Sequence, residues 1–414
     1  MNRIMKVMLM LSLCFGFSTV MAQASEIEIL VNKLVDKGIL SPIEADIIKD
    51  ETKQAVVAEV SEGKSYAIPA WVQNVKIKQD LRLRHQWEKK KSDAEGRNRS
   101  RIRYRLGLET KVADGITAGI GLATGGTDHR STNETLEDTF ESPDIRLDYA
   151  YGEWKVNNQL KVVGGKHKRK AYLWTPTDLL WDSDVNPNGV AFNFKQGLSD
   201  TVSGWVNGSY WIVDHRDQDD PDPSMVTAQV GLTHKGDKTD AKLAGTYYDF
   251  HGLEGRANQT NGSGTNTTDA NGIKYDFDIL SASAELGVKE LFGGLPLSID
   301  QRVAIFGEYV HNTEADSQND GWAIGVKLGS KKVKKPGTWQ LKYIHANLET
   351  DAFVDFLPDS DRYGGNTNVQ SDEVALKYAI KKNVVFGLDY YNSDRNTGIS
   401  DKEQVVQADL QLKF

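Results

Sequence analysis

Basic side chains occupy every second position in two strand-like segments. Residues 72–87 read VQNVKIKQDLRLRHQW, and residues 98–112 carry four alternating arginines. A period of two places the cations on one face of a β-strand and the apolar residues on the other. Around water, guanidinium groups attract anions and can pass phosphate-like groups between them. The cations expected on this face are Lys76, Lys78, Arg82, Arg84, Arg99, Arg101, Arg103 and Arg105. Asp80 and Glu109 interrupt the set, and the alternative to a free basic face is pairing with acidic loop residues.

A second candidate is segment 166–189, KHKRKAYLWTPTDLLWDSDVNPNG, which begins basic and ends acidic. Its charged candidates are Lys166, Lys168, Arg169, Asp178, Asp182 and Asp184. Opposite charges held across a narrow aqueous passage create a transverse field that favours dipolar or zwitterionic solutes. We expect the acidic residues to face the arginines. Two alternatives stay open: an ordinary surface loop with Trp174 and Trp181 packed at a rim, or a basic run that extends an anion path.

Strand-like segments surround both candidates and continue to the last residue. Further alternating segments lie near 116–125, 144–155, 159–166, 189–197, 202–213, 225–235, 241–251, 277–290, 298–312, 321–332, 338–349, 372–381, 384–393 and 403–414. With the two basic segments they make about sixteen, an even number. We therefore predict an all-β fold, an antiparallel transmembrane β-barrel over residues 70–414. Its lumen should be polar and hold water.

Short and long connections alternate between these strands. Tight polar turns are expected at 113–115, 156–158, 236–240 and 381–383, and long polar loops near 126–143, 166–188, 214–224, 252–276 and 350–371. This asymmetry is typical of outer-membrane barrels, which have short periplasmic turns and longer outer loops. Segment 166–189 is the third long loop, and we predict that it folds inward and narrows a pore.

The N-terminal region predicts the compartment. Arg3 and Lys6 precede an apolar run, and Ala22-Gln23-Ala24 supplies small residues for cleavage, so residues 1–24 are predicted to be a secretory signal peptide. The single cysteine, Cys14, lies within that peptide, so we expect no disulfide in the mature chain.

Residues 25–69 have helical rather than strand-like spacing. Gly38 can end a first helix, and Ser41 with Glu44 resembles a capping box at the start of a second. We predict two short amphipathic helices in the periplasm, followed by a linker. A spacer, subunit assembly through the helices and a plug all remain possible roles.

Composition excludes several protein classes. The chain is 39% hydrophobic with a mean hydropathy of −0.49, which is too polar for a bundle of membrane helices but suits a barrel. The formal charge of −8 argues against nucleic acid as a general partner.

Signatures of catalysis or metal binding are weak. His129-Arg130-Ser131 has the residue types of a hydrolytic pair, but it lies in a polar loop without an orienting third group. The acidic run 214–222 lacks the spacing and glycine of a calcium loop. We predict no enzyme, no cofactor and no metal site.

The last strand, residues 403–414, reads EQVVQADLQLKF and ends an apolar stripe on Phe414. A C-terminal aromatic residue on an alternating strand resembles the assembly signal of Gram-negative outer-membrane proteins. The segments LVDKGILSPIEA and LWDSDVNPNGVAF, together with the full-length pattern, resemble the putative porin family of Gram-negative bacteria.

The resemblance implies a passive outer-membrane channel for small hydrophilic solutes or ions, commonly a homotrimer. It also implies contact with outer-membrane lipid and lipopolysaccharide, and delivery to the barrel-assembly machinery through Phe414. The basic strands add a possible anion bias. A structural or adhesive surface barrel with a blocked lumen is the alternative function.

Overall fold

The computed structural model describes residues 30–63, 74–215, 222–259, 261–291 and 301–414. The chain divides into two compact units, Met1–Gln73 and Asn74–Phe414. The predicted signal peptide and the linker after the helices lie outside the described residues. Among the residues that are described, no helix is long and apolar enough to span a membrane.

The first unit contains the two helices expected from its spacing. Residues 30–36 are helical, and Gly38 ends this helix with a positive φ of 68°. Helix α3 then runs over Pro42–Gly63. At its start the amide of Ser41 donates to Glu44 Oε2 at 2.9 Å, and the amide of Glu44 donates to Ser41 Oγ at 3.3 Å. The predicted capping box is therefore confirmed, although α3 is longer than a short helix.

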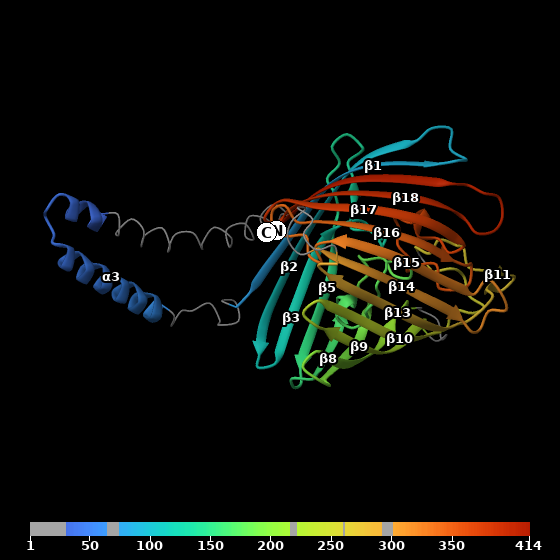
Figure 1. The fold of residues 1–414 in the computed structure, drawn as a ribbon, viewed down its shortest axis with the longest axis horizontal. Helices are drawn as coiled ribbons and strands as arrows, with labels where there is room; N and C mark the ends of the chain where they lie inside the picture. Colours follow the sequence, from blue (N-terminus) through green and yellow to red (C-terminus); the bar gives the residue numbers. More distant parts are fainter. Residues whose placement is uncertain (1–29, 64–73, 216–221, 260, 292–300) are drawn as a thin grey trace, which may run out of the picture. The chain divides into compact units, whose positions relative to one another are not determined.

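The second unit is a closed antiparallel barrel, which confirms the predicted fold. Its described residues form sixteen long strands, and β1 pairs with β19 to close the sheet (Figure 1). The strands are β1 Lys76–Lys90, β2 Arg97–Ala113, β3 Ile116–Thr124, β5 Ile145–Lys155, β6 Leu160–Lys166, β7 Asn188–Gly197, β8 Val202–Ile212, β9 Ser224–Lys235, β10 Thr239–His251, β13 Phe277–Lys289, β14 Arg302–Asn312, β15 Asp320–Gly329, β16 Trp339–Leu348, β17 Val369–Lys381, β18 Val384–Arg395 and β19 Glu403–Lys413.

Short strands and 3₁₀ turns lie in the connections between the long strands. Strand β4 (Glu134–Thr135) pairs with β2, while β11 (Thr268–Asp269) and β12 (Gly272–Ile273) form a small hairpin. Two 3₁₀ turns lie in longer loops: η2 (Arg169–Ala171) between β6 and β7, and η3 (Tyr363–Gly365) between β16 and β17.

Alternation along each strand separates the lumen from the outer wall. In β1, Leu83 is 45% exposed, while its neighbours Arg82 and Arg84 are 9% and 5% exposed. The same contrast runs through β14, where Ile305 and Tyr309 are exposed and Phe306 and Val310 are buried. Apolar residues therefore face outward, as a lipid-facing band requires.

The buried interior is not uniformly polar, contrary to the prediction. One apolar cluster lies inside the wall, and it includes Trp181, Trp211, Tyr248, Phe250, Phe277, Phe306 and Phe353. Most of these side chains come from inward positions of β8–β14, and the others come from two loops. The prediction failed because it assumed that the lumen holds water along its whole length, whereas loops fill part of it.

Candidate functional site

The loop between β6 and β7, residues 167–187, packs against the inner face of the wall. Leu179, Leu180 and Trp181 are at most 1% exposed. The ring centroid of Trp181 lies 5.7 Å from that of Trp211, an inward residue of β8, in an edge-to-face arrangement. Burial of these apolar side chains stabilises the loop inside the barrel rather than over its rim. Trp181 therefore does not pack as a rim residue.

This loop leaves the barrel wall next to a pair of glycines. Gly165 on β6 and Gly189 on β7 lie opposite each other in the strand register. Their φ values are 111° and 140°, and a Cβ at either position would lie 2.4 or 2.2 Å from a neighbouring carbonyl oxygen. Only glycine tolerates both conditions. The local backbone is thus suited to turning inward here.

The loop between β16 and β17, residues 349–368, also lies inside the barrel. Phe353 is fully buried, and its ring centroid lies 5.5 Å from Tyr248 and 6.0 Å from Phe250. This segment had been expected to be one more polar outer loop. Its apolar run Phe353–Leu357 is the sequence signal that could have indicated burial.

The predicted basic positions of β1 and β2 divide into buried and exposed groups. Arg82, Arg84 and Arg103 are buried on the inner face, whereas Lys76 and Lys78 are exposed. Acidic partners neutralise much of the stripe. Its closest charge contacts are Arg84 to Asp409 at 2.7 Å, Arg99 to Glu88 at 2.6 Å, Arg103 to Asp80 at 2.5 Å, Arg105 to Asp80 at 3.2 Å, Arg82 to Asp409 at 3.5 Å and Lys78 to Glu109 at 3.7 Å.

The remaining arginine of the stripe, Arg101, has neutral hydrogen-bond partners. Arg101 donates to the carbonyl oxygen of Asn133 at 3.1 Å and to Gln86 Oε1 at 3.3 Å. A guanidinium held by neutral acceptors keeps its full charge. Among the five arginines of β2, Arg101 is the one with no carboxylate of the described residues within ion-pair distance.

The three aspartates of the 167–187 loop have different partners. Asp184 lies 3.3 Å from Arg105, as expected for a residue facing the stripe. Asp178 instead pairs with Arg362 at 3.0 Å, and Asp182 accepts hydrogen bonds from the amide and hydroxyl of Ser360. The structure therefore brings one of the three to the arginines and joins the other two to the 349–368 loop.

Burial and charge perturb these loop carboxyls in opposite directions. Burial, together with nearby Asp184, raises the pKa of Asp182 to about 8. For Asp184, burial works in the raising direction, but Arg103 and Arg105 outweigh it and hold its pKa below the usual range. Burial therefore favours the neutral form of Asp182, whereas the two arginines favour the charged form of Asp184.

The basic run that opens the loop is also divided. Arg169 is 3% exposed, and its guanidinium carbon lies 5.0 Å from the ring centroid of Trp181. Lys168 Nζ lies 4.1 Å from the ring centroid of Tyr149. Lys166 Nζ donates to the carbonyl oxygen of Asn186 at 2.8 Å. Only Lys168 and the following Lys170 are exposed side chains.

Two cavities border these loops. An inner cavity of about 620 Å³ is lined by the loop residues Lys168–Lys170 and Ser183–Asn186, by Arg105, and by Lys413 and Phe414 of the last strand. A second cavity of about 260 Å³ is lined by Lys166, Trp181, Trp211 and part of the 349–368 loop. Each of these two spaces is large enough for a small solute.

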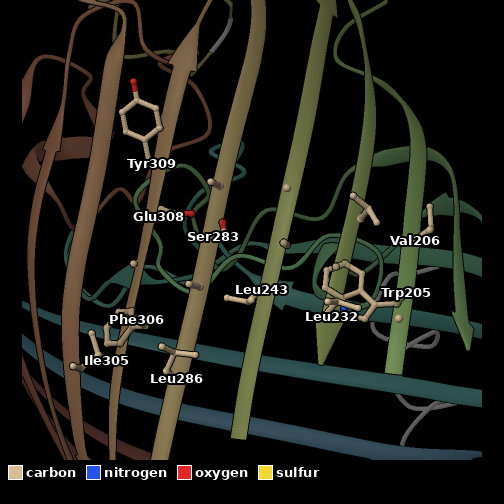
Figure 2. Close-up of a pocket in the computed structure, with 18 of the residues that line it drawn as sticks. Trp205, Val206, Leu232, Leu243, Ser283, Leu286, Ile305, Phe306, Glu308 and Tyr309 are labelled. Carbon is tan, nitrogen blue, oxygen red and sulfur yellow. The ribbon is translucent and has the colours of Figure 1, made fainter. Parts of the chain in front are cut away.

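A further hollow of about 900 Å³ lies on the wall of the barrel (Figure 2). Outward residues of β9–β14 border it, including Leu232, Leu243, Leu286 and Ile305, all at least 45% exposed. Its lining is apolar, and the charged Glu308 points to the inner side of the sheet. It belongs to the lipid-facing surface and is not a solute path.

No metal centre is evident in the described parts of the chain, where no group of three or more His, Cys, Asp or Glu side chains is suitably placed. Most of the acidic run 214–222 lies outside those parts.

Comparison with known proteins identifies the family. A family model described as putative porin matches residues 88–281 and 270–414. OprB of Pseudomonas putida has a similar fold, with a TM-score of 0.55 at 9% identity over 83% of this chain and 95% of that one. The outer-membrane channel DcaP of Acinetobacter baumannii gives 0.48 at 15% identity over 82% and 97%. No curated protein matches the chain. The chain therefore belongs to the putative porin family, and its barrel is that of an outer-membrane channel.

Proposed function

We propose that this porin passes small hydrophilic solutes and ions with a preference for anions. The observation that supports the preference is the lining of the inner cavity, where basic side chains outnumber acidic ones. The basic residues are Lys78, Arg105, Lys168, Arg169, Lys170 and Lys413, and the acidic residues are Asp80, Asp148 and Asp184. Lining charges of one sign raise the local concentration of ions of the other sign.

Lysines of this lining that have no carboxylate partner should contribute most to this preference. Among the described residues, no carboxylate lies within ion-pair distance of the ammonium group of Lys170 or Lys413. The arginines of the β1–β2 stripe contribute less to the net charge, because Asp80, Asp409 and Glu88 already lie against them. The anion path is therefore centred on lysines rather than on the whole stripe.

The double variant Lys170→Gln, Lys413→Gln tests this assignment. Under a KCl gradient in a planar bilayer, its reversal potential should shift toward that of a cation-selective channel, while its conductance persists. Lys335→Gln is the matched control, since Lys335 is exposed in a turn and lines neither inner space. An unchanged reversal potential in the double variant, or an equal shift in the control, would overturn the proposal.

We further propose that residues 1–24 direct secretion, that helix α3 and the preceding helix lie in the periplasm, and that the barrel forms a homotrimer. The resemblance to porins supports these assignments, as does the exposed Phe414 at the end of the last strand for delivery to the assembly machinery. Native mass spectrometry of the detergent-purified protein gives the subunit number. A monomer at all protein concentrations would contradict the trimer.

A further inference from the structure

The inner cavity and the second cavity, which we name the outer cavity, share one short piece of the 167–187 loop. Comparison of their linings shows that Val185 and Asn186 border both, whereas every other described lining residue borders only one. Val185 is buried in the apolar cluster, and Asn186 is half-buried. A direct passage between the two cavities would therefore run past Val185 and Asn186.

Polar contacts hold Asn186 from both sides. Lys166, which lines the outer cavity, donates through Nζ to the carbonyl oxygen of Asn186 at 2.8 Å. The side-chain amide of Asn186 donates to Asp148 Oδ1 at 3.1 Å and to the carbonyl oxygen of Asp148 at 3.3 Å. Asp148 lines the inner cavity. The three residues form a polar bar, which we name the Lys166–Asn186–Asp148 bar.

A β-bulge in β5 turns the side chain of Asp148 toward this bar. In the pairing of β3 with β5, Gly121 lies opposite Tyr149 and Leu122 lies opposite Leu147, so Asp148 is an extra residue without a partner. As a result Asp148 and Tyr149 are both buried, although adjacent strand residues normally point to opposite faces. Bulges of this kind re-aim side chains and are frequent beside functional sites.

The backbone around Asn186 is also fixed. The amide of His167 donates to the carbonyl oxygen of Pro187 at 3.0 Å, and the amide of Val185 donates to that of Asp182 at 3.4 Å. The buried Val185 anchors the other side. The asparagine side chain is thus held in place by its two polar partners and by the loop itself.

We propose that the Lys166–Asn186–Asp148 bar is the narrowest point of the solute route and that the side chain of Asn186 sets the size limit of the channel. This inference rests on the proposed channel function. It assigns the size limit to a neutral amide flanked by a cation on the outer side and a carboxylate on the inner side. The aspartates Asp178 and Asp182 are not part of the filter.

Single-channel conductance of the reconstituted protein tests the proposal. One variant has a smaller side chain at position 186, and the other has a larger one. Asn186→Ala should raise conductance on the order of two-fold, because the narrowest section dominates the resistance of an aqueous passage. Asn186→Trp should reduce conductance severely. In liposome-swelling assays the alanine variant should also admit larger neutral sugars than the wild type.

Asn193→Ala is the control. Asn193 points inward from β7 and its amide donates to Asn207 Oδ1 at 2.6 Å, yet it lines neither cavity. Its loss should leave conductance and sugar cut-off unchanged. Heat-modified migration on gels shows that each variant is a folded barrel.

A cysteine variant supplies an independent readout. Because Cys14 is the single cysteine of the sequence, Asn186→Cys in a Cys14→Ser background presents one thiol. Bulky thiol reagents added during recording should block the current.

The outcomes distinguish the proposed bar at Asn186 from the proposed channel function. A wild-type protein that conducts, combined with unchanged conductance in both Asn186 variants and no block of the cysteine variant, would overturn the bar while leaving the channel intact. A folded wild-type protein that does not conduct would instead contradict the channel function.

Discussion

Arg362 ties the two inward loops to the wall, and its removal should release them. The residue lies in the 349–368 loop and is 2% exposed. Its guanidinium contacts Asp178 of the 167–187 loop at 3.0 Å and Glu373 of β17 at 2.9 Å. Lys342 of β16 also pairs with both carboxylates. In Arg362→Met, the buried Glu373 and the half-buried Asp178 would share a single cation.

The size of the effect follows from the cost of an unpaired buried charge. Removing one partner of a buried ion pair typically destabilises a structure by about 3–5 kcal/mol. Every 1.4 kcal/mol corresponds to a factor of ten in population, so the released form of the loops should become at least about 100-fold more frequent. Methionine retains the apolar contacts of the arginine stem, and the loss is therefore mainly electrostatic.

Hydrogen exchange measured by mass spectrometry reports this release directly, since amides exchange when a segment opens locally. Peptides from 349–368 and 167–187 should lose protection by about 100-fold in the variant, given the pair energy above. Wall peptides such as those from β14 should keep theirs. In bilayers, the released loops should appear as increased open-channel noise.

Arg97→Met serves as the control, because Arg97 is exposed and its carboxylate partners lie at 3.8 and 3.9 Å. Such surface pairs contribute at most about 1 kcal/mol. Unchanged exchange of both loops in Arg362→Met would refute the reasoning, since it would mean that apolar packing alone holds them.

Two further predictions concern charges of the same interior. Because the pKa of Asp182 is raised to about 8 when folded, its contribution to stability is complete at pH values below the ordinary carboxyl range and is lost as the pH rises through about 8. The melting temperature in detergent should therefore fall between pH 5 and 9, and Asp182→Asn should flatten this fall; an equally steep fall in the variant would contradict the assignment. Replacing Arg101, Arg103 and Arg105 by alanine should lower anion preference, because the change removes three cations and leaves Asp80 without its arginine partners. Unchanged ion selectivity in the triple variant would remove these arginines from the pore lining.

The strands were predictable because burial on one face leaves a period of two in the sequence. All sixteen expected segments correspond to strands, and loop-length asymmetry predicted the arrangement of connections. Capping chemistry likewise predicted the start of α3 at Ser41, since the reciprocal hydrogen bonds with Glu44 depend on local spacing alone.

The ion pairs inside the barrel were less predictable than its strands. Alternation placed Arg84 on the inner face, but its partners Asp361 and Asp409 are 277 and 325 residues away in the chain. Their proximity depends on barrel closure between β1 and β19, and on a loop that turns inward. The mostly apolar segment 353–357 is compatible with a loop that turns inward. An outer loop with exposed apolar residues would have the same sequence pattern.

The bar at Asn186 had no comparable signal. Asp148 reaches it only because a bulge shifts the register of β5 by one residue, and period-two counting assumes that the register is constant. An asparagine before a proline in a loop is also common in turns. Sequence reasoning therefore singled out the loop that lies inside the barrel, but it gave no reason to choose Asn186.

Current through the reconstituted wild-type protein under a KCl gradient is the most direct test of the central claim. We expect discrete channels whose reversal potential indicates a preference for chloride over potassium, because the basic side chains of the inner cavity outnumber the acidic ones. A cation-preferring reversal potential would contradict the assigned anion path. A folded barrel that carries no current would contradict the aqueous passage itself and favour a lumen blocked by its two inward loops.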